Sequence, residues 1–422
     1  GGMASGAGVA GSMKFCMLTS FFGRHSFGGD AVYVERLSRA LLKRGHEVDV
    51  VYSVDAHAAV RRGGGTVRFE PFEGMRVHGL KSAWGGLAPL AIHQTGWPGA
   101  LRGPIEGILA ERRFDVLHFH NISLIGGPGA LSLSCPGRPR RLMTAHEYWL
   151  VCPLSVLWKF GERTCEKAEC TRCMLKAGRP PQWWRGWRDW QQELDAVDVL
   201  LTPSQASARI HRERGLRRAM EVLPYFVGDE WREKLSSAPA RRRPYFAFAG
   251  RLVKEKGLGT LIPMMRKLPG VDLRIAGRGP YEAELRATAS GMENVEFLGY
   301  LGFEGLREFY AGARALVAPS RMVETFGYVV LESHAVGTPA IVPDVGGISE
   351  SVRRSGGGIV YDSDAELFEA LGRLAEDDTL RRELGGNARD AVEKFWTEEQ
   401  HLEQYFAHLG AAGPAGAPQS QV

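Results

Sequence analysis

The chain has 422 residues and a net charge of +5, and 44% of its residues are hydrophobic and 24% charged. This balance is typical of a globular protein, and the length predicts two domains because it exceeds what one ordinary core accommodates. The sequence shows no run of eighteen apolar residues and no secretory signal, so we expect a cytoplasmic protein that does not span a membrane.

The N-terminal half alternates strand and helix patterns. The first twelve residues have the composition of a vector-derived leader before Met13 and are excluded from the predicted fold. A short apolar run at 13–22 predicts a buried parallel strand, and a glycine-rich turn leads into a helix at 32–45. Further strands are predicted at 46–53, 115–121, 140–147 and 197–204.

The C-terminal half repeats this alternation after a break. Residues 228–243 are polar, charged and proline-bearing, which predicts a linker. A helix is then predicted at 257–268, and strands at 244–251, 271–279, 294–301, 313–320 and 338–344. A last helix at 396–409 is expected to pack back on the N-terminal domain, and residues 410–422 have the composition of a disordered tail.

These patterns predict an α/β protein with two Rossmann-like, doubly wound domains, one over residues 13–227 and one over 244–395. In open sheets of this kind, ligands sit at the carboxyl ends of the strands. We therefore expect the strand-to-helix loops of both domains to face one central cleft.

Positive charge is concentrated between residues 101 and 190, where 14 lysines and arginines stand against 8 acidic residues. A basic surface suits an anionic ligand or peripheral contact with an anionic inner membrane face. A solvated surface is an equally good interpretation. No nucleic-acid-binding motif accompanies the charge, so nucleic acid is not an expected partner.

Two glycine-bearing turns in the C-terminal half suit a phosphate ligand. The predicted strand at 244–251 ends in Gly250 and Arg251, and Lys256 follows at the start of a helix. An arginine fork, a lysine charge and a helix N-terminus together suit a diphosphate. The next strand ends in Gly277 and Arg278, where a glycine turn lets backbone N–H groups approach a ligand. Each turn alone is a weak signal.

The stretch ETFGYVVLE at 324–332 places two carboxylates around an apolar segment. Glu324 is expected in a loop, Thr325 to Gly327 should offer backbone N–H groups, and Glu332 should lie in the helix that follows. Carboxylates accept hydrogen bonds and therefore suit the recognition of neighbouring hydroxyl groups. They are too far apart to share a proton as an acid–base pair.

Together with TPAIVPDVGG after them, these motifs resemble the retaining family-4 glycosyltransferases of GT-B fold, also called glycosyl transferases group 1. The resemblance covers residues 13–409, and this conjunction of motifs is specific. It implies a hexosyl-type transferase that moves a sugar from a nucleotide sugar, a UDP- or GDP-sugar being expected, to an acceptor hydroxyl on a glycan, a lipid-linked molecule or a small molecule.

The resemblance also implies roles for single residues. Arg251 and Lys256 would hold the diphosphate, Glu324 the sugar hydroxyls and Glu332 the ribose. In the N-terminal half, His146 would contact the sugar, and the strand-end pair His120 and Asn121 suits acceptor contact or a structural role. The expected catalytic residues are thus His146, Arg251, Lys256 and Glu324, and the expected donor-binding residues are Gly28, Gly29, Gly250, Arg251, Lys256, Gly277, Arg278, Tyr300, Leu301, Glu324, Thr325, Phe326, Gly327 and Glu332. One departure is VLPYF at 222–226, where many relatives carry an Asn-Gly turn, so no phosphate contact is assigned there.

The resemblance implies same-face, retaining transfer without a catalytic metal, and no aspartate-rich metal motif is visible. A β-phosphate oxygen can take the acceptor proton, so no protein base is required. Three alternatives remain open: a sugar-nucleotide epimerase, a phosphorylase and a non-catalytic module that binds nucleotide sugars. The sequence shows no signature of the first two, and the intact charged set argues against the third.

A predicted insert at 150–192 contains four cysteines, Cys152, Cys165, Cys170 and Cys173. Four soft ligands ending in C-x2-C suit a structural zinc site, while an iron–sulfur cluster and four ordinary cysteines remain alternatives. Four tryptophans follow at helical spacing, interleaved with arginines, at 183, 184, 187 and 190. An interfacial helix is one interpretation, but we favour tryptophans that pack on the domain.

Overall fold

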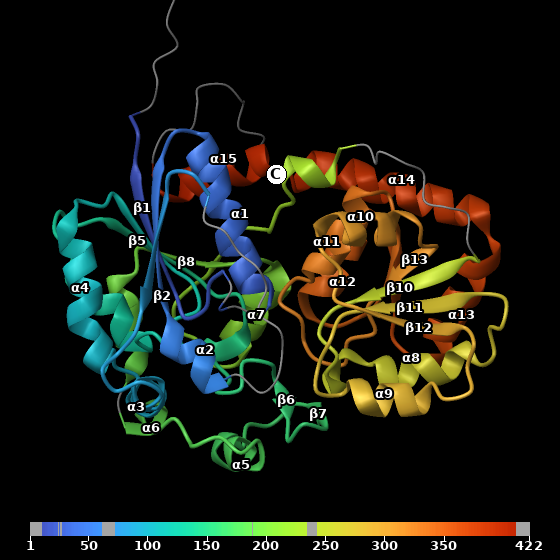
Figure 1. The fold of residues 1–422 in the computed structure, drawn as a ribbon, viewed down its shortest axis with the longest axis horizontal. Coiled ribbons are helices and arrows are strands. Elements are labelled where there is room, and N and C mark those ends of the chain that lie inside the picture. Colours follow the sequence, from blue (N-terminus) through green and yellow to red (C-terminus); the bar gives the residue numbers. More distant parts are fainter. Residues whose placement is uncertain are drawn as a thin grey trace, which may run out of the picture.

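The computed structural model describes residues 11–23, 25, 28–60, 72–187, 189–233 and 243–410. Its secondary structure forms two lobes side by side, each an open parallel sheet with helices on both faces (Figure 1). The predicted pair of doubly wound α/β units is therefore confirmed. Most of the leader, the middle of the linker and most of the tail lie outside the described residues, and the predicted domain boundaries stay predictions.

The first sheet has the order β3-β2-β1-β4-β5-β8-β9, and all its neighbouring strands are parallel. Its strands are mostly apolar because helices cover both faces and leave little room for polar side chains. They are β1 (Lys14–Thr19), β2 (Glu47–Ser53), β3 (Met75–Leu80), β4 (Val116–Phe119), β5 (Arg140–Thr144), β8 (Val199–Thr202) and β9 (Glu221–Val222). The helices of this part are α1 (Gly29–Lys43), α2 (Val54–Val60), α3 (Leu87–Thr95), α4 (Arg102–Glu111), α5 (Cys170–Lys176), α6 (Trp184–Trp187) and α7 (Gln205–Glu213).

The second sheet has the order β12-β11-β10-β13-β14-β15 and is also parallel. Its strands are β10 (Tyr245–Ala249), β11 (Asp272–Ala276), β12 (Val295–Gly299), β13 (Ala315–Val317), β14 (Ala340–Pro343) and β15 (Gly358–Tyr361). Its helices are α8 (Leu258–Met265), α9 (Glu282–Thr288), α10 (Phe303–Ala311), α11 (Tyr328–Ala335), α12 (Gly346–Ser355), α13 (Asp364–Glu376) and α14 (Asp378–Phe395). In both sheets the strand order reverses beside the first strand, which is where ligands bind in such folds.

The last helix, α15 (Glu398–His408), crosses from the second lobe to the first at the top of Figure 1. Thr397 begins it with a capping box, in which its side chain and that of Gln400 each accept a backbone N–H. The ring of Tyr405 packs against Phe15 of β1, and its hydroxyl lies 3.0 Å from Nδ1 of His118 on β4. Thus α15 packs on the first sheet.

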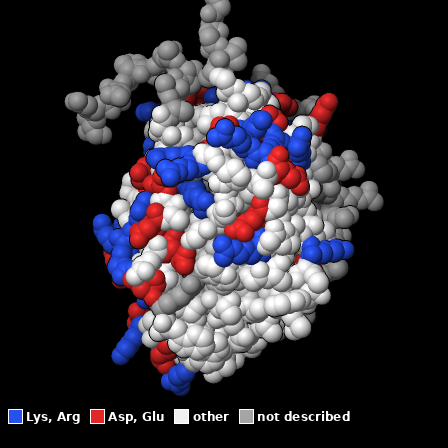
Figure 2. All heavy atoms as spheres, turned by 90° about the vertical axis from the view of Figure 1, so that its left-hand side faces the viewer, with Lys and Arg blue, Asp and Glu red and all other residues white. Residues whose placement is uncertain are grey.

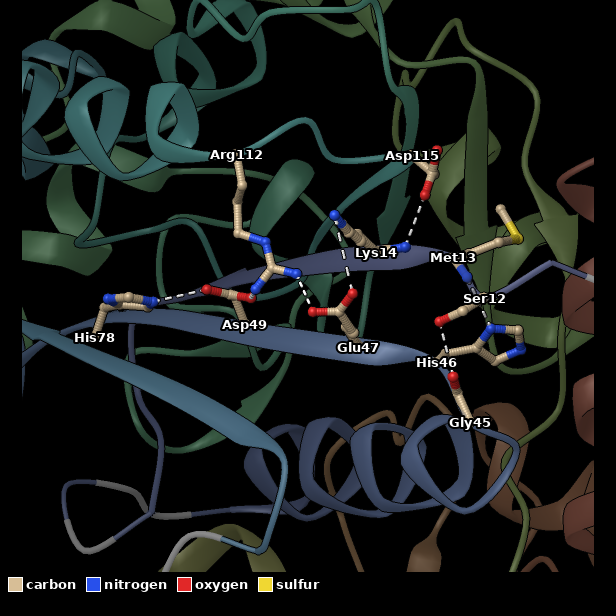
Figure 3. Close-up of polar contacts among 10 residues, drawn as sticks. All are labelled: Ser12, Met13, Lys14, Gly45, His46, Glu47, Asp49, His78, Arg112 and Asp115. Atoms are coloured by element: carbon tan, nitrogen blue, oxygen red, sulfur yellow. Dashed lines mark hydrogen bonds and ion pairs between the residues drawn. The ribbon is translucent and has the colours of Figure 1, made fainter.

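A polar cluster ties β1, β2 and β3 together (Figure 3). The buried carboxylate of Asp49 accepts from Nη1 of Arg112 at 3.0 Å and lies 2.9 Å from Nε2 of His78. Asp115 accepts the backbone N–H of Lys14 at 2.7 Å. Every charged group of this cluster has a partner within it, so the cluster has a structural role.

Candidate functional site

The glycine-bearing loops of the second lobe, which carry Gly257 and Gly277, meet at the carboxyl ends of β10, β11 and β13. Gly257 has a φ of 78°, and a Cβ there would stand 1.8 Å from the carbonyl oxygen of Pro319. A Cβ at Gly277 would stand 1.9 Å from the carbonyl oxygen of Gly250. Such spacing leaves room only for glycine, which explains why the sequence places glycines where these loops cross.

Two cations lie at this edge in different surroundings. Arg251 is exposed, and its guanidinium makes no hydrogen bond or ion pair within the described residues. The ammonium of Lys256, at the end of a single 3-10 turn, lies 2.5 Å from Oε1 of Glu324. The same carboxylate oxygen accepts from the hydroxyl of Ser320 at 2.8 Å. A predicted cation and a predicted carboxylate are thus brought together by the fold.

The backbone between Glu324 and α11 is open for hydrogen bonding. Gly327 has a φ of 94° and precedes the first turn of the helix. In the part of the chain that the structure describes, the N–H groups of Thr325, Phe326 and Gly327 donate no hydrogen bond. Arg278, Tyr300 and Leu301 follow β11 and β12 at the same edge, and Tyr300 is 63% exposed. Free N–H groups beside two cations form an anion-binding environment.

Glu332 faces the other lobe and is buried. Its Oε1 lies 2.8 Å from Nη2 of Arg36 on α1, and its Oε2 lies 3.5 Å from the hydroxyl of Tyr310. The guanidinium of Arg36 also lies over the ring of Tyr328 at 4.7 Å. Burial raises the pKa of Glu332, while Arg36 acts in the opposite direction. This carboxylate therefore depends on a cation supplied by a distant part of the sequence.

The two lobes also meet through hydrogen bonds around Thr325. Its hydroxyl donates to the carbonyl oxygen of His146 at 2.8 Å, and its own carbonyl accepts from the hydroxyl of Ser204 at 2.6 Å. The carboxylate of Glu350 on α12 accepts the N–H groups of Gln205 and Ala206, the first residues of α7, at 3.1 and 2.7 Å. The loop that carries Glu324 is therefore held against the first lobe.

His146 is buried in a group of rings at the carboxyl end of β5. Its Nδ1 lies 2.6 Å from the hydroxyl of Tyr225, and its Nε2 lies 3.0 Å from Nδ1 of His120. Burial lowers the pKa of His146 to about 3, so the ring is neutral at pH 7. Tyr225 stacks on Tyr328 of the second lobe with centroids 4.7 Å apart. His120 and His146, the two predicted histidines, thus belong to one hydrogen-bonded network that also contains Tyr225.

Two carboxylates lie on either side of Asn121. Its amide donates to Asp30 at 3.1 Å and to Glu147 at 3.4 Å. Asp30 follows the predicted glycine pair, and Gly29 lies where a Cβ would come 3.5 Å from the ring of Tyr328. A cavity of about 20 Å³, room for about one water molecule, is lined by His120, Asn121, His146 and Glu147 among others. This side of the site is acidic as well as histidine-bearing.

Burial raises the pKa of Glu147 to about 7, and the neighbouring Asp30 carboxyl adds to the rise. The native state then keeps a proton that the unfolded chain loses near pH 4.5. Stability therefore falls as the pH rises from about 4.5 to about 7. We expect Glu147→Gln, which stays neutral, to be more stable than the wild type by about 2 kcal/mol at pH 8, with little gain at pH 5. Urea unfolding at both values measures this.

Glu284→Gln is the matched control, since that carboxylate is exposed on α9. Its stability relative to the wild type should change by less than about 0.5 kcal/mol between the two pH values. An equal pH response in the two variants would contradict a special environment for Glu147.

Sequence reasoning missed four residues that the fold brings to this site: Arg36, Asp30, Glu147 and Tyr225. Glu147 was visible beside His146 in the stretch TAHE, and Asp30 beside the glycine pair. Tyr225 belongs to VLPYF, which departs from the family pattern and so carries no family role. Arg36 carries no local signal, because it lies among polar residues on a helix and its partner is 296 residues away.

The four cysteines of the insert line one cavity of about 20 Å³ beside the lobe interface. All four are free of disulfides. Across the described ranges, no group of three or more His, Cys, Asp or Glu side chains is placed so that it could hold a metal ion. The structure therefore shows no assembled metal site at these cysteines, and the predicted zinc site stays a prediction.

The tryptophans of the insert divide into two pairs. Trp184 and Trp190 are buried, as the packing interpretation expected, whereas Trp183 and Trp187 are 44% and 77% exposed and stack 6.0 Å apart. Trp184–Trp187 form α6, whereas Trp190 begins a separate 3-10 helix (Trp190–Ala196), so the predicted helical stripe is interrupted. The lower part of the face in Figure 2, on the side of α3 and α6, shows few charged side chains. None of the described helices is long and apolar enough to cross a bilayer, and the predicted membrane-surface contact stays a prediction.

Two family models match successive parts of the chain. The model described as Glycosyltransferase Family 4 matches residues 27–231, and the model described as Glycosyl transferases group 1 matches residues 229–391. Between them they span both lobes and every motif at the lobe interface described above.

Curated relatives include an uncharacterized glycosyltransferase of Methanocaldococcus jannaschii, MJ1607, which is 25% identical over 402 residues, 91% of this chain and 94% of its own length. The sulfoquinovosyl transferase SQD2 of Arabidopsis thaliana is 33% identical over 235 residues, 51% of this chain and 46% of its own length.

Solved structures with the same fold include the sucrose-phosphate synthase of Thermosynechococcus elongatus, with a TM-score of 0.73 and 20% identity over 94% of this chain and 99% of that one. HepE of Anabaena in complex with UDP has a TM-score of 0.66 and 16% identity over 94% of this chain and all of that one. At these identities the likeness concerns the fold.

Proposed function

This chain is a family-4 glycosyltransferase of GT-B fold, and we propose that it transfers a sugar, with retention, from a nucleoside diphosphate sugar to an acceptor hydroxyl. The observation that carries the proposal is the meeting of Lys256 and Glu324 beside exposed Arg251 at the carboxyl edge of the second sheet. A pyrophosphate needs the cations, and sugar hydroxyls need the carboxylate.

The donor binds against the second lobe. Its diphosphate takes the place of the Glu324 carboxylate beside Lys256, with Arg251 and the free N–H groups of Phe326 and Gly327 as further donors of hydrogen bonds. Glu324, released from the lysine, accepts from hydroxyl groups of the sugar. The base lies near Tyr300 and Leu301. HepE binds UDP according to the solved complex, which supports a uridine nucleotide as the first choice.

The ribose hydroxyls are bound by Glu332. This step requires Arg36 to share that carboxylate, since the pair is formed across the lobes at 2.8 Å. Donor binding is then linked to the contact between the lobes, because the Glu332 carboxylate binds both the ribose and Arg36.

Transfer needs stabilisation of the charge that develops on the leaving diphosphate, which the two cations and the N–H groups supply without a catalytic metal. An oxygen of the leaving phosphate takes the acceptor proton. His146 is neutral and hydrogen-bonded to Tyr225 and His120, so it acts by contact with the sugar and by position rather than as an acid. Asn121 and Glu147 contact the acceptor from the first lobe.

The test is a thermal-shift panel with UDP, GDP and ADP, followed by an assay of nucleoside diphosphate release from the matching nucleotide sugar. A ligand that binds only the native state raises the melting temperature, so the cognate nucleotide should give the largest shift. Slow release without acceptor marks a transferase and separates it from an epimerase, a phosphorylase and a non-catalytic module. No shift with any nucleotide would contradict the proposal.

A further inference from the structure

Four cysteines meet in a compact part of the first lobe, which we call the cysteine module, residues 152–176. Cys152 follows a 3-10 turn, and the antiparallel pair β6 (Trp158–Lys159) and β7 (Arg163–Thr164) leads to Cys165. Cys170 and Cys173 both lie in the first turn of α5, and a spacing of three places them on one side of the helix. Three separate backbone segments therefore contribute cysteines to the lining of one cavity.

The space between these sulfurs is suited to a single ion. The cavity measures about 20 Å³, which is enough for one water molecule or one bare cation. Each cysteine has one rotatable side-chain bond, so its sulfur can change position without movement of the backbone. Free thiols that line one cavity can thus become four ligands.

Hydrogen-bond donors surround the sulfurs. The N–H of Phe160, at the tip of the hairpin, donates to Sγ of Cys173 at 3.3 Å. The ammonium of Lys159 lines the same cavity and is held by Glu169 at 2.5 Å and by the carbonyl of Lys167 at 2.9 Å. Donors and a cation next to thiolates are the outer contacts that sulfur-rich metal sites require.

The module has little apolar packing of its own. Leu157, Trp158 and Met174 are buried in it, but none belongs to the three large hydrophobic clusters of the molecule. A disulfide or a metal is a common way to stabilise a segment with so little apolar packing. The module also contacts the second lobe. The hydroxyl of Thr164 donates to the carbonyl of Arg321 at 3.4 Å, in the loop that leads to Glu324.

We propose that Cys152, Cys165, Cys170 and Cys173 bind one zinc ion tetrahedrally as a structural site. Four protein ligands close the coordination shell, which leaves no position for substrate or water, so the ion has no part in the transfer. The four thiols release their protons to solvent on binding, and the metal stabilises the module beside the donor loop. This site goes beyond the proposed transferase activity and does not depend on it.

The test is elemental analysis of the full chain, produced with both zinc and iron in the medium and purified without chelator. We expect about one zinc ion per chain and its release when a mercurial reagent blocks four thiols. Cys173→Ser should lower the zinc content at least tenfold, whereas Cys135→Ser, a cysteine outside the module, should keep it.

Three results would overturn the site. Iron in place of zinc, with visible absorption, would assign a cluster instead. A mass lower by two or four hydrogen atoms would assign disulfides. Metal-free wild-type protein with four freely titrating module thiols would remove the metal altogether. Since these measurements are made on the wild-type chain, they remain decisive even where the serine variant fails to fold.

Discussion

Lys256→Ala is expected to lower kcat/KM for sugar transfer by at least about 100-fold while the melting temperature stays within a few degrees of the wild type. The ammonium is the donor nearest to Glu324, at 2.5 Å, and has no other partner among the described residues. Its loss removes a positive charge from the position where negative charge develops on the leaving phosphate. Steady-state release of the nucleoside diphosphate with the cognate donor measures the effect.

Lys254→Ala is the matched control, because Lys254 is an exposed lysine in the same 3-10 turn, two positions before Lys256. It should change kcat/KM by less than about threefold, since an exposed charge is screened by solvent. Equal losses in the two variants would show a general electrostatic effect rather than a phosphate contact. Near-wild-type turnover by Lys256→Ala would remove the lysine from the proposed mechanism.

Arg36→Met is expected to lower the free energy of unfolding by about 3 kcal/mol at pH 8, because it leaves the buried Glu332 carboxylate without its cation. The loss should shrink at pH 5. Burial already raises the pKa of Glu332, and removal of Arg36 raises it further, so the carboxyl takes up a proton as the pH falls. Urea unfolding at the two pH values measures both parts of the prediction.

The double variant Arg36→Met with Glu332→Gln should recover most of the lost stability, since the neutral amide does not need a cation. Arg39→Met is the control on the same helix, because its ion pair with Glu35 is more exposed and longer, at 3.6 Å. It should cost less than about 1 kcal/mol. A loss for Arg36→Met that is independent of pH and of residue 332 would show that the packing of the side chain, and not its charge, stabilises the lobe interface.

Most strands were predictable because a buried parallel strand needs a continuous apolar run, as at Lys14–Thr19 and Tyr245–Ala249. The missed strands are short or polar. Met75–Leu80 carries an arginine and a histidine at an edge of the sheet, and Gly358–Tyr361 has four residues. Glu221–Val222 pairs over two residues only, which leaves no periodic pattern.

Motifs that lie within one loop, or at the beginning of one helix, were likewise predictable from the sequence. Gly250, Arg251 and Lys256 lie within seven residues, and Glu324 and Glu332 within nine, so local spacing fixes which side chains can reach the same ligand. The fold class and the family follow from such local patterns, because alternating strands and helices of this kind have few packing solutions.

What only the tertiary structure decided is which groups face one another across the lobes. Glu332 meets Arg36, Thr325 meets His146, and Tyr225 stacks on Tyr328, each pair joined by contacts between residues about 100 to 300 positions apart. The convergence of the module cysteines on one cavity is of the same kind. Sequence by itself determined most of the elements, the two cation-bearing loops and the family. Pairings between distant segments depend on how two sheets pack, and no local propensity encodes that packing.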